Sequence, residues 1–457
     1  MAQREASRRD FLTSAAVAVG AAALPMAPAA DALALPQAMP RRDVVPYRVG
    51  HWLPSDRRVL NLWLAALKEE ARAQAKPVEP EVAAFRALIE NDADIYMYFH
   101  QMFEELPSAP EFKTDPTGEP QVDNYETMLL LINHILTTAP TYNETGLVGF
   151  PINAILDWPM GTPGGFAAFL NDKVNLRLKK ILDTWSRFLA SPQSAYVLNE
   201  DPTTGWFGRD ALKKMPNFVE DYVCDPKVPH WGFTSWDDFF TRRFREGRRP
   251  VAAPDDGSVI VNACESAPYK IAREVKAMDR YWIKSQPYSL RHMFGDDPVH
   301  SEFVGGTIYQ AFLSATSYHR WHSPVSGTVV RAWTIDGSYY SETPAVHFDP
   351  AAPNESQGYI TEVAARAVVL IKADNPKIGL MAFLAIGMAE VSGCDVTVKA
   401  GQHVKKGDEI GTFHFGGSTH CLIFRPGVEV EFDLGGQTPG LDAKNIKINT
   451  AIARVNG

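Results

Sequence analysis

The chain is poor in cysteine and has no surplus of positive charge. Its 457 residues include only four cysteines, Cys224, Cys264, Cys394 and Cys421, and these form no C-x-x-C pair and no zinc spacing. We expect buried free thiols, although an oxidising compartment would also permit disulfides. The net charge of -9 supplies no basic surface for phosphates, which argues against nucleic acid as a partner.

Long apolar runs are missing beyond the first residues, so the sequence predicts no transmembrane segment. Residues 7–34, SRRDFLTSAAVAVGAAALPMAPAADALA, combine two arginines, an apolar stretch and small residues. This is the layout of a signal peptide, and its start resembles the bacterial twin-arginine type. The alternative is a fraying amphipathic helix. Cleavage after Ala29 or Ala34 would leave an exported, periplasmic protein.

The remaining pattern predicts an α+β protein, with a helical part at about 40–245 and a β-rich part at 246–457. Apolar residues recur at helical spacing over residues 60–71 and 174–189. After a linker at residues 245–258, short β-branched runs predict strands at 259–263, 327–335, 367–373, 380–387 and 427–434. In the last of these runs the alternation of apolar and polar residues is strict.

Residues 396–413, VTVKAGQHVKKGDEIGTF, predict three short strands joined by turns. The segment resembles the barrel-sandwich hairpins of lipoyl and biotinyl carriers. Such carriers display a modified lysine on an exposed hairpin. Here Lys405 and Lys406 precede the turn glycine, and we expect both to face solvent without a carrier role.

The stretch FHFGGSTHCLIF, residues 413–424, places two glycines before Ser418 in what otherwise reads as buried sheet. Glycine in a strand usually marks a bulge or a close backbone approach. The alternative is that Ser418 is a reactive residue. A hydrolase elbow is excluded because the G-x-S-x-G pattern is absent. A metal site is disfavoured too, since His319 and His322 in YHRWH lack the glutamate of H-E-x-x-H.

Self-cleavage fits this stretch better. A serine hydroxyl can attack the carbonyl of the preceding residue and form an ester in place of the peptide bond. Elimination from this ester leaves dehydroalanine, which water hydrolyses to a pyruvoyl group at the new chain end with release of ammonia. Glycine permits the required backbone distortion, and histidine supplies a base near neutral pH. The sequence therefore predicts cleavage between Gly417 and Ser418.

Four segments, found in family order, resemble the phosphatidylserine decarboxylase family: residues 236–251, 282–290, 306–327 and 415–419. The helical part is not typical of the phosphatidylserine enzymes. It resembles the additional domain of fungal tryptophan decarboxylases, a soluble branch of that family, most clearly at residues 175–189 and 230–240. The likeness covers nearly all of the mature chain.

The resemblance implies a zymogen that processes itself into a pyruvoyl-dependent carboxy-lyase. Ser418 matches the serine that becomes the pyruvoyl group, His322 the base of the self-cleavage triad, and His319 a histidine implicated in decarboxylation. Either histidine alone would more often be a structural residue. Glu265 of ACES takes the place of the family's triad aspartate. Asp256 in PDDG is the alternative acid, but it precedes the strand, where a turn is expected.

The resemblance also implies a reaction. The pyruvoyl carbonyl would bind a substrate α-amine as a Schiff base and withdraw electrons as CO2 leaves, with His319 as proton donor. No diffusible cofactor and no metal are expected, and the large and small chains would stay together. A free aromatic amino acid such as tryptophan is the favoured substrate. Phosphatidylserine is the alternative, and a silent binding protein that never cleaves is a third hypothesis.

Two features stay open in the sequence. The loop at residues 337–358 is long enough to act as a lid over a site, or it is a surface insertion. The sequence does not indicate the oligomeric state, and a homo-oligomer stays open as one alternative.

Overall fold

A computed structural model describes residues 57–74, 76–105, 122–142, 150–279, 287–314, 316–343, 356–390, 393–415 and 417–456. The signal peptide expected at residues 7–34 lies outside these ranges, as does the middle of the expected lid. All of these described residues belong to one compact unit. No helix in the described ranges is long and apolar enough to cross a membrane.

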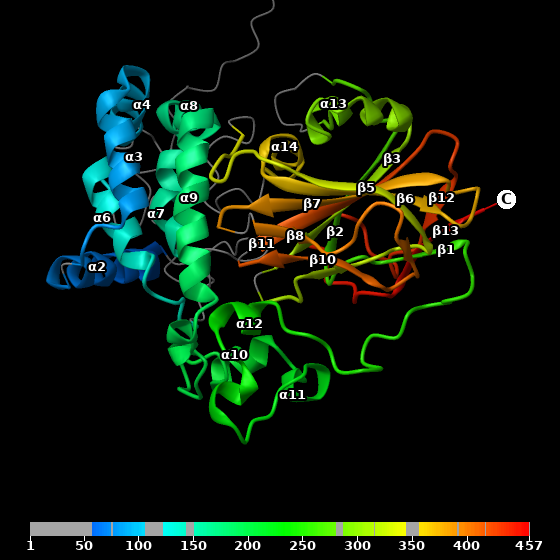
Figure 1. Ribbon diagram of the computed structural model, residues 1–457, viewed down its shortest axis with the longest axis horizontal. Coiled ribbons are helices and arrows are strands. Elements are labelled where there is room, and N and C mark those ends of the chain that lie inside the picture. Colours follow the sequence, from blue (N-terminus) through cyan, green and yellow to red (C-terminus); the bar gives the residue numbers. More distant parts are fainter. Residues whose placement is uncertain are drawn as a thin grey trace, which may run out of the picture. The chain divides into compact units, whose positions relative to one another are not determined.

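Helices dominate the first half of the described chain (Figure 1). They are α2 (Arg57–Ala73), α3 (Pro80–Asn91), α4 (Ala93–Glu104), α6 (Tyr125–Ile135), α7 (Pro151–Met160), α8 (Pro163–Leu170), α9 (Asp172–Leu189), α10 (Arg209–Lys214), α11 (Phe218–Asp221) and α12 (Trp236–Phe240). The β-rich half adds α13 (Leu290–Met293) and α14 (Gln357–Val363). Short 3-10 turns are η2 (Pro192–Val197), η3 (Pro229–Gly232) and η4 (Pro298–Phe303).

Helix α9 shows how the sequence specifies these helices. The side chain of Asn171 accepts a hydrogen bond from the backbone N–H of Lys173 at 2.9 Å and so caps the first turn. Val174, Leu178 and Trp185 are among the residues that α9 buries on one side. This confirms the helical spacing predicted for residues 174–189 and gives α9 a continuous apolar face.

Strands fill the second half. They are β1 (Val259–Val261), β2 (Ala267–Arg273), β3 (Thr307–Leu313), β4 (Arg320–His322), β5 (Gly327–Ile335), β6 (Arg366–Ala373), β7 (Leu380–Met388), β8 (Gly393–Val396), β9 (His403–Val404), β10 (Glu409–His414), β11 (Gly417–Phe424), β12 (Val430–Phe432) and β13 (Ala451–Val455). All five predicted strand runs are confirmed in type, although β1 and β12 are shorter than expected. The α+β pattern of a helical part followed by a β-rich part is therefore confirmed.

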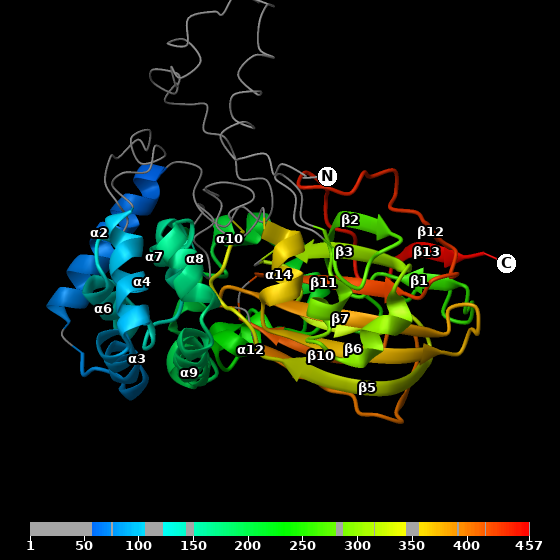
Figure 2. The same cartoon turned by 90° about the horizontal axis from the view of Figure 1, so that it is seen from above.

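The strands form a seven-stranded sheet and two three-stranded sheets, all with antiparallel pairing. The large sheet has the order β2-β3-β11-β7-β6-β5-β9, and Figure 2 shows its first six strands following one another in that order. The small sheets are β1-β13-β12 and β4-β10-β8. Strands β3, β7 and β11 are buried along nearly their whole length, which explains why they read as continuous apolar runs.

The segment at 396–413 departs from the expected hairpin. Strands β8 and β10 pair with each other, but β9 pairs with β5 in the large sheet. The prediction that both lysines face solvent is wrong for Lys406, which is 4% exposed. Its Nζ donates hydrogen bonds of 2.8 Å to the carbonyls of Ala253 and Asp256, and these replace the water that the ammonium group loses. Lys405 is exposed as expected.

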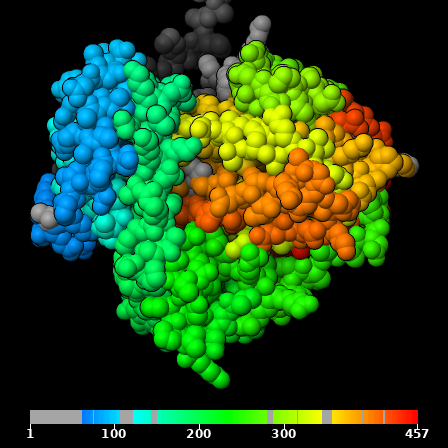
Figure 3. Space-filling model, viewed as in Figure 1, coloured from blue at the N-terminus to red at the C-terminus, as the bar shows by residue number. Residues whose placement is uncertain are grey.

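Contacts join the helical and β-rich parts directly. Lys179 of α9 forms an ion pair with Asp336 at 2.5 Å, and Figure 3 shows α9 lying against the yellow and orange segments of the β-rich part. The expected linker is also anchored, since Arg248 and Arg249 both bind the carboxylate of Asp221. The helical part therefore packs against the sheets.

Candidate active site

Ser418 lies at the start of the central strand β11. It pairs with Leu313 of β3 on one side and with Gly387 of β7 on the other. Its side chain is fully buried, and its Oγ has no hydrogen-bond partner among the described residues. An unsatisfied buried hydroxyl costs about 1–3 kcal/mol, so such a group calls for a functional explanation.

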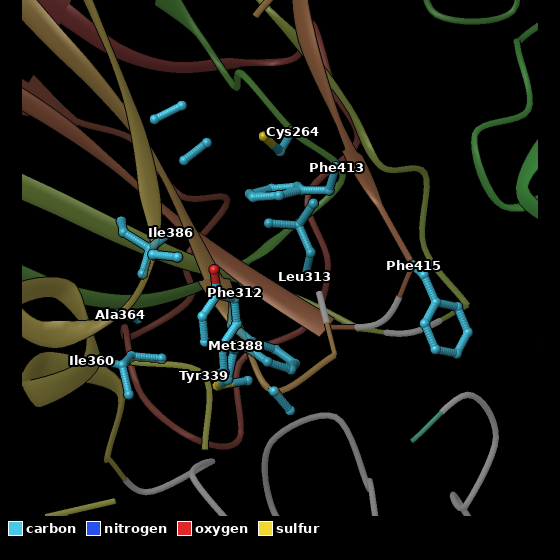
Figure 4. Packing of buried hydrophobic residues seen from close by; sticks show 14 of the residues in the cluster. Cys264, Phe312, Leu313, Tyr339, Ile360, Ala364, Ile386, Met388, Phe413 and Phe415 are labelled. Carbon is cyan, nitrogen blue, oxygen red and sulfur yellow. The ribbon is translucent and has the colours of Figure 1, made fainter. Parts of the chain in front are cut away.

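The chain turns sharply just before Ser418. Strand β10 ends at His414, and Phe415 adopts a left-handed backbone with φ of 46°. This conformation is uncommon for a residue with a side chain and is a form of strain found at functional sites. Figure 4 shows the ring of Phe415 directed away from Phe413 and Leu313.

Aromatic rings of the helical part hold the Phe415 ring. The centroid of Trp185 in α9 lies 4.6 Å away in an edge-on arrangement. The rings of Trp236 and Phe240 in α12 lie at 6.0 and 5.9 Å. The helical part thus fixes the residue that stands three positions before Ser418.

His319 is buried close to the same bend. Its ring stacks on that of Phe240, with centroids 4.0 Å apart and planes 21° apart. Its carbonyl accepts the backbone N–H of Phe413 at 2.9 Å. His319 therefore lies on the wall formed by α12 and β10, next to the Phe415 cluster.

His322 lies further from the bend, opposite Glu409 at the other end of β10. Its Nδ1 lies 2.7 Å from the carbonyl oxygen of Gly407, which can only accept, so Nδ1 carries the proton. Its Nε2 then accepts a hydrogen bond of 2.9 Å from the hydroxyl of Tyr318. Burial lowers the pKa of His322, so the ring is a neutral base whose lone pair is occupied by Tyr318.

The two candidate acids have other partners. Glu265 is buried and accepts a 2.5 Å hydrogen bond from Arg249, and burial raises the pKa of Glu265 while Arg249 opposes the rise. No hydrogen bond joins Glu265 to His322, whose ring nitrogens are both engaged. Asp256 forms the expected turn by binding Ser258, and these bonds lower the pKa of Asp256 to about 2. The structure therefore does not join serine, histidine and acid by hydrogen bonds.

A third histidine, His420, is also close to Ser418 and was not singled out from the sequence. Residues two apart on a strand share a face, so the side chains of Ser418 and His420 project from the same side of β11. Burial lowers the pKa of His420 to about 3, and its ring stacks on Phe383 at 5.8 Å. The ring is therefore neutral and packs against Phe383.

His414, the last residue of β10, forms a charged clamp. Its Nδ1 lies 2.9 Å from an oxygen of Asp237 in α12, and its Nε2 lies 3.0 Å from an oxygen of Asp395 in β8. Burial alone would lower the pKa of His414, but the two carboxylates outweigh burial and raise it to about 10. A charged imidazolium therefore ties α12 to β10 and to β8.

A buried carboxyl group that the sequence analysis did not identify, that of Glu390, lies just after the end of β7. Glu390 is 4% exposed and accepts the backbone N–H of Asn153 in α7 at 2.8 Å. In the sequence, the feature that could have identified Glu390 is a carboxylate directly after the apolar run LMAFLAIGMA.

Among the described residues, no group of three or more histidine, cysteine, aspartate or glutamate side chains could hold a metal ion. The four cysteines are free thiols.

Comparison with known proteins covers both parts of the chain. Two family models, each described as phosphatidylserine decarboxylase, match residues 79–215 and 236–445. An L-tryptophan decarboxylase of Psilocybe cyanescens is 35% identical over 94% of this chain and 99% of its own length. The decarboxylase iboD of Amanita muscaria is 43% identical over 67% of this chain and 92% of its own length.

A phosphatidylserine decarboxylase proenzyme of Schizosaccharomyces pombe matches less of the chain. It is 31% identical over 48% of this chain and 21% of its own length. The matches to the two fungal decarboxylases are longer and closer. From these similarities over most of its length, the chain belongs to the phosphatidylserine decarboxylase family and is a decarboxylase.

Proposed function

We propose that this decarboxylase cuts itself between Gly417 and Ser418, carries a pyruvoyl group made from Ser418, and acts on a free aromatic L-amino acid, tryptophan first. The observation that carries the proposal is the Ser418 hydroxyl, fully buried and without a hydrogen-bond partner among the described residues. It follows a strained bend, which is where an attack on the preceding carbonyl needs backbone distortion.

The residues present fit such a group. Ser418 is held between β3 and β7, so a group formed there would be fixed in a dry, rigid strand. When formed, a pyruvoyl carbonyl withdraws electrons from the substrate as CO2 leaves. The aromatic wall of Phe240 and Phe415 excludes water, and His319 is the candidate to return a proton to the substrate carbon.

Self-cleavage needs a base, and His322 is the candidate because burial keeps it neutral. Its Nε2 becomes available only when the Tyr318 hydroxyl gives up the present hydrogen bond. Glu265 acts on His322 only if Arg249 releases it. The proposed triad therefore requires a rearrangement in which both of these hydrogen bonds break, together with the one from Nδ1 of His322 to the carbonyl of Gly407.

The choice of substrate is supported by which part of the chain each relative matches. The relative named L-tryptophan decarboxylase matches 94% of the chain, so its likeness includes the helical part. The phosphatidylserine proenzyme matches only 48%. Because rings of α9 and α12 hold Phe415 beside Ser418, the helical part is suited to shape the substrate pocket.

We further infer export through a twin-arginine signal at residues 7–34. Replacing Arg8 and Arg9 by lysine should keep the protein in the cytoplasm of a bacterial host. Cell fractionation measures this, and unchanged export would contradict the signal assignment.

The test of function is a competition assay on the purified mature protein. L-tryptophan, L-phenylalanine, L-tyrosine and micellar phosphatidylserine are offered together, and amine products are identified by mass spectrometry, with Ser418→Ala as the blank. We expect tryptamine, together with a large chain ending at Gly417. Phosphatidylethanolamine alone would overturn the substrate, and an uncut chain of full mature mass would support the silent binding protein.

A further inference from the structure

Three residues with buried polar side chains, Asn153, Tyr340 and Glu390, lie where the helical part reaches the end of β7. Met388, the last residue of β7, pairs with Gly417, and Glu390 follows two positions later. Glu390 accepts the backbone N–H of Asn153 from α7. Tyr340 is adjacent, because Ala389 donates its N–H to the carbonyl of Tyr339 at 3.0 Å.

These side chains have polar atoms that the fold leaves unsatisfied. Within the described ranges, Oε2 of Glu390, both side-chain amide atoms of Asn153 and the hydroxyl of Tyr340 have no hydrogen-bond partner. Each such buried group costs about 1–3 kcal/mol. The backbone N–H groups of Ile152, Asn153 and Glu390 itself act on the carboxyl of Glu390, but they satisfy neither the amide of Asn153 nor the hydroxyl of Tyr340.

The surroundings are apolar and aromatic. The ring of Tyr340 meets that of Phe169 in α8 edge-on, with centroids 6.3 Å apart. Burial raises the pKa of Glu390 to about 8, so near neutral pH the carboxyl is largely uncharged. A neutral carbonyl acceptor among rings matches a neutral aromatic N–H.

The position along β7 distinguishes the two ends of a substrate. The α-amine must reach the group formed at Ser418, whose neighbour in β7 is Gly387. Glu390 lies three residues further on, and the distance is less than the roughly 10 Å of an extended chain because Ala389 has a left-handed backbone with φ of 56°. This separation suits the side chain of the substrate and not its amine.

We propose that Glu390 is a specificity-determining residue whose carboxyl accepts the ring N–H of an indole substrate, with Asn153 and Tyr340 as its polar neighbours. This inference rests on the proposed function, because it takes the substrate to be an aromatic amino acid. It gives the helical part a role in substrate recognition, since Asn153 belongs to α7.

The test compares kcat/KM for L-tryptophan, 1-methyl-L-tryptophan and L-phenylalanine in the processed enzyme and its variants. Loss of one N–H against a buried acceptor lowers kcat/KM strongly, so we expect tryptophan to exceed its 1-methyl analogue by at least about 100-fold. Glu390→Met should reduce this ratio to below about 5-fold, mainly by loss of tryptophan turnover. Glu390→Gln keeps an acceptor oxygen and should retain most of the preference.

Glu362→Met is the matched control. Glu362 is also buried and also accepts a backbone N–H, that of Ser289 at 3.0 Å. Its loss should destabilise the protein without changing the substrate ratio. Equal losses for all three substrates in Glu390→Met would overturn the inference and leave Glu390 as a cap of α7.

Calorimetric binding to the uncut Ser418→Ala chain gives a readout that needs no turnover. Glu390→Met in this background should weaken tryptophan binding by at least about 10-fold and phenylalanine binding far less. Equal weakening would contradict the inference. Absence of tryptamine from the wild-type enzyme would instead defeat the proposed function, so the two failures are distinguishable.

Discussion

The imidazolium of His414 should stabilise the fold in a pH-dependent way. Raising its pKa from 6.5 to about 10 corresponds to at most about 5 kcal/mol. The His414 side chain is 27% exposed and that of Asp395 is 70% exposed, so water screens one arm of the clamp. We therefore expect about 2 kcal/mol from the clamp, carried mainly by Asp237, which is 19% exposed.

The sign follows from the direction of the shift. A pKa that is higher in the folded than in the unfolded chain stabilises the fold fully below the unfolded value, near pH 6.5. The contribution is then lost as pH rises through the folded value of about 10. Replacing His414 by glutamine should consequently reduce the free energy of unfolding most at pH 6 and least above pH 10.

Urea unfolding followed by tryptophan fluorescence measures this in the uncut Ser418→Ala background. Adding His414→Gln should lower the free energy of unfolding by about 2 kcal/mol at pH 6, with the difference disappearing by about pH 10.5. Asp237→Asn should reproduce most of the loss and Asp395→Asn less than about 0.5 kcal/mol. A difference that stays constant with pH would refute the electrostatic reasoning, as would equal losses for the two aspartates.

Three further changes have defined outcomes. Tyr318→Phe frees Nε2 of His322, so self-cleavage of newly made chain, followed on denaturing gels, should accelerate by about 3-fold or more; a slower reaction would assign Tyr318 a supporting role. Gly411→Ala places a Cβ 2.4 Å from a buried tryptophan ring, and urea unfolding should show a loss of about 1–3 kcal/mol. Lys406→Met removes the two hydrogen bonds that the Lys406 ammonium group donates to Ala253 and Asp256 and should lower the free energy of unfolding by about 2 kcal/mol, whereas the exposed Lys405→Met changes it by less than about 0.5 kcal/mol.

Periodicity in the sequence was sufficient to predict the elements but not their pairing. The apolar spacing at residues 174–189 and the β-branched run at 327–335 correspond to α9 and β5. The alternation at residues 427–434 is also confirmed, with Val428, Val430 and Leu434 buried. These patterns are local, whereas the pairing of β9 with β5 depends on contacts between segments about 75 residues apart.

Side-chain partners were the least predictable feature. A lysine beside a turn glycine is usually exposed, and only the carbonyls of a distant turn explain why Lys406 is buried. The sequence identified Ser418 and the two histidines by motif, but it gave no sign that Tyr318 occupies His322 or that Arg249 holds Glu265. Glu390 belongs to no motif, and its interest comes from atoms that only the folded chain brings together.

The central place of β11 has a consequence for the life of each molecule. A cut before Ser418 would leave β11 hydrogen-bonded to β3 and β7 along its length, and β13 to β1. The short fragment could then leave only if the large sheet came apart. An enzyme whose reactive group has been consumed by a side reaction therefore cannot be renewed by exchanging that fragment for a fresh one. Each molecule would be matured once and, when spent, replaced by new synthesis.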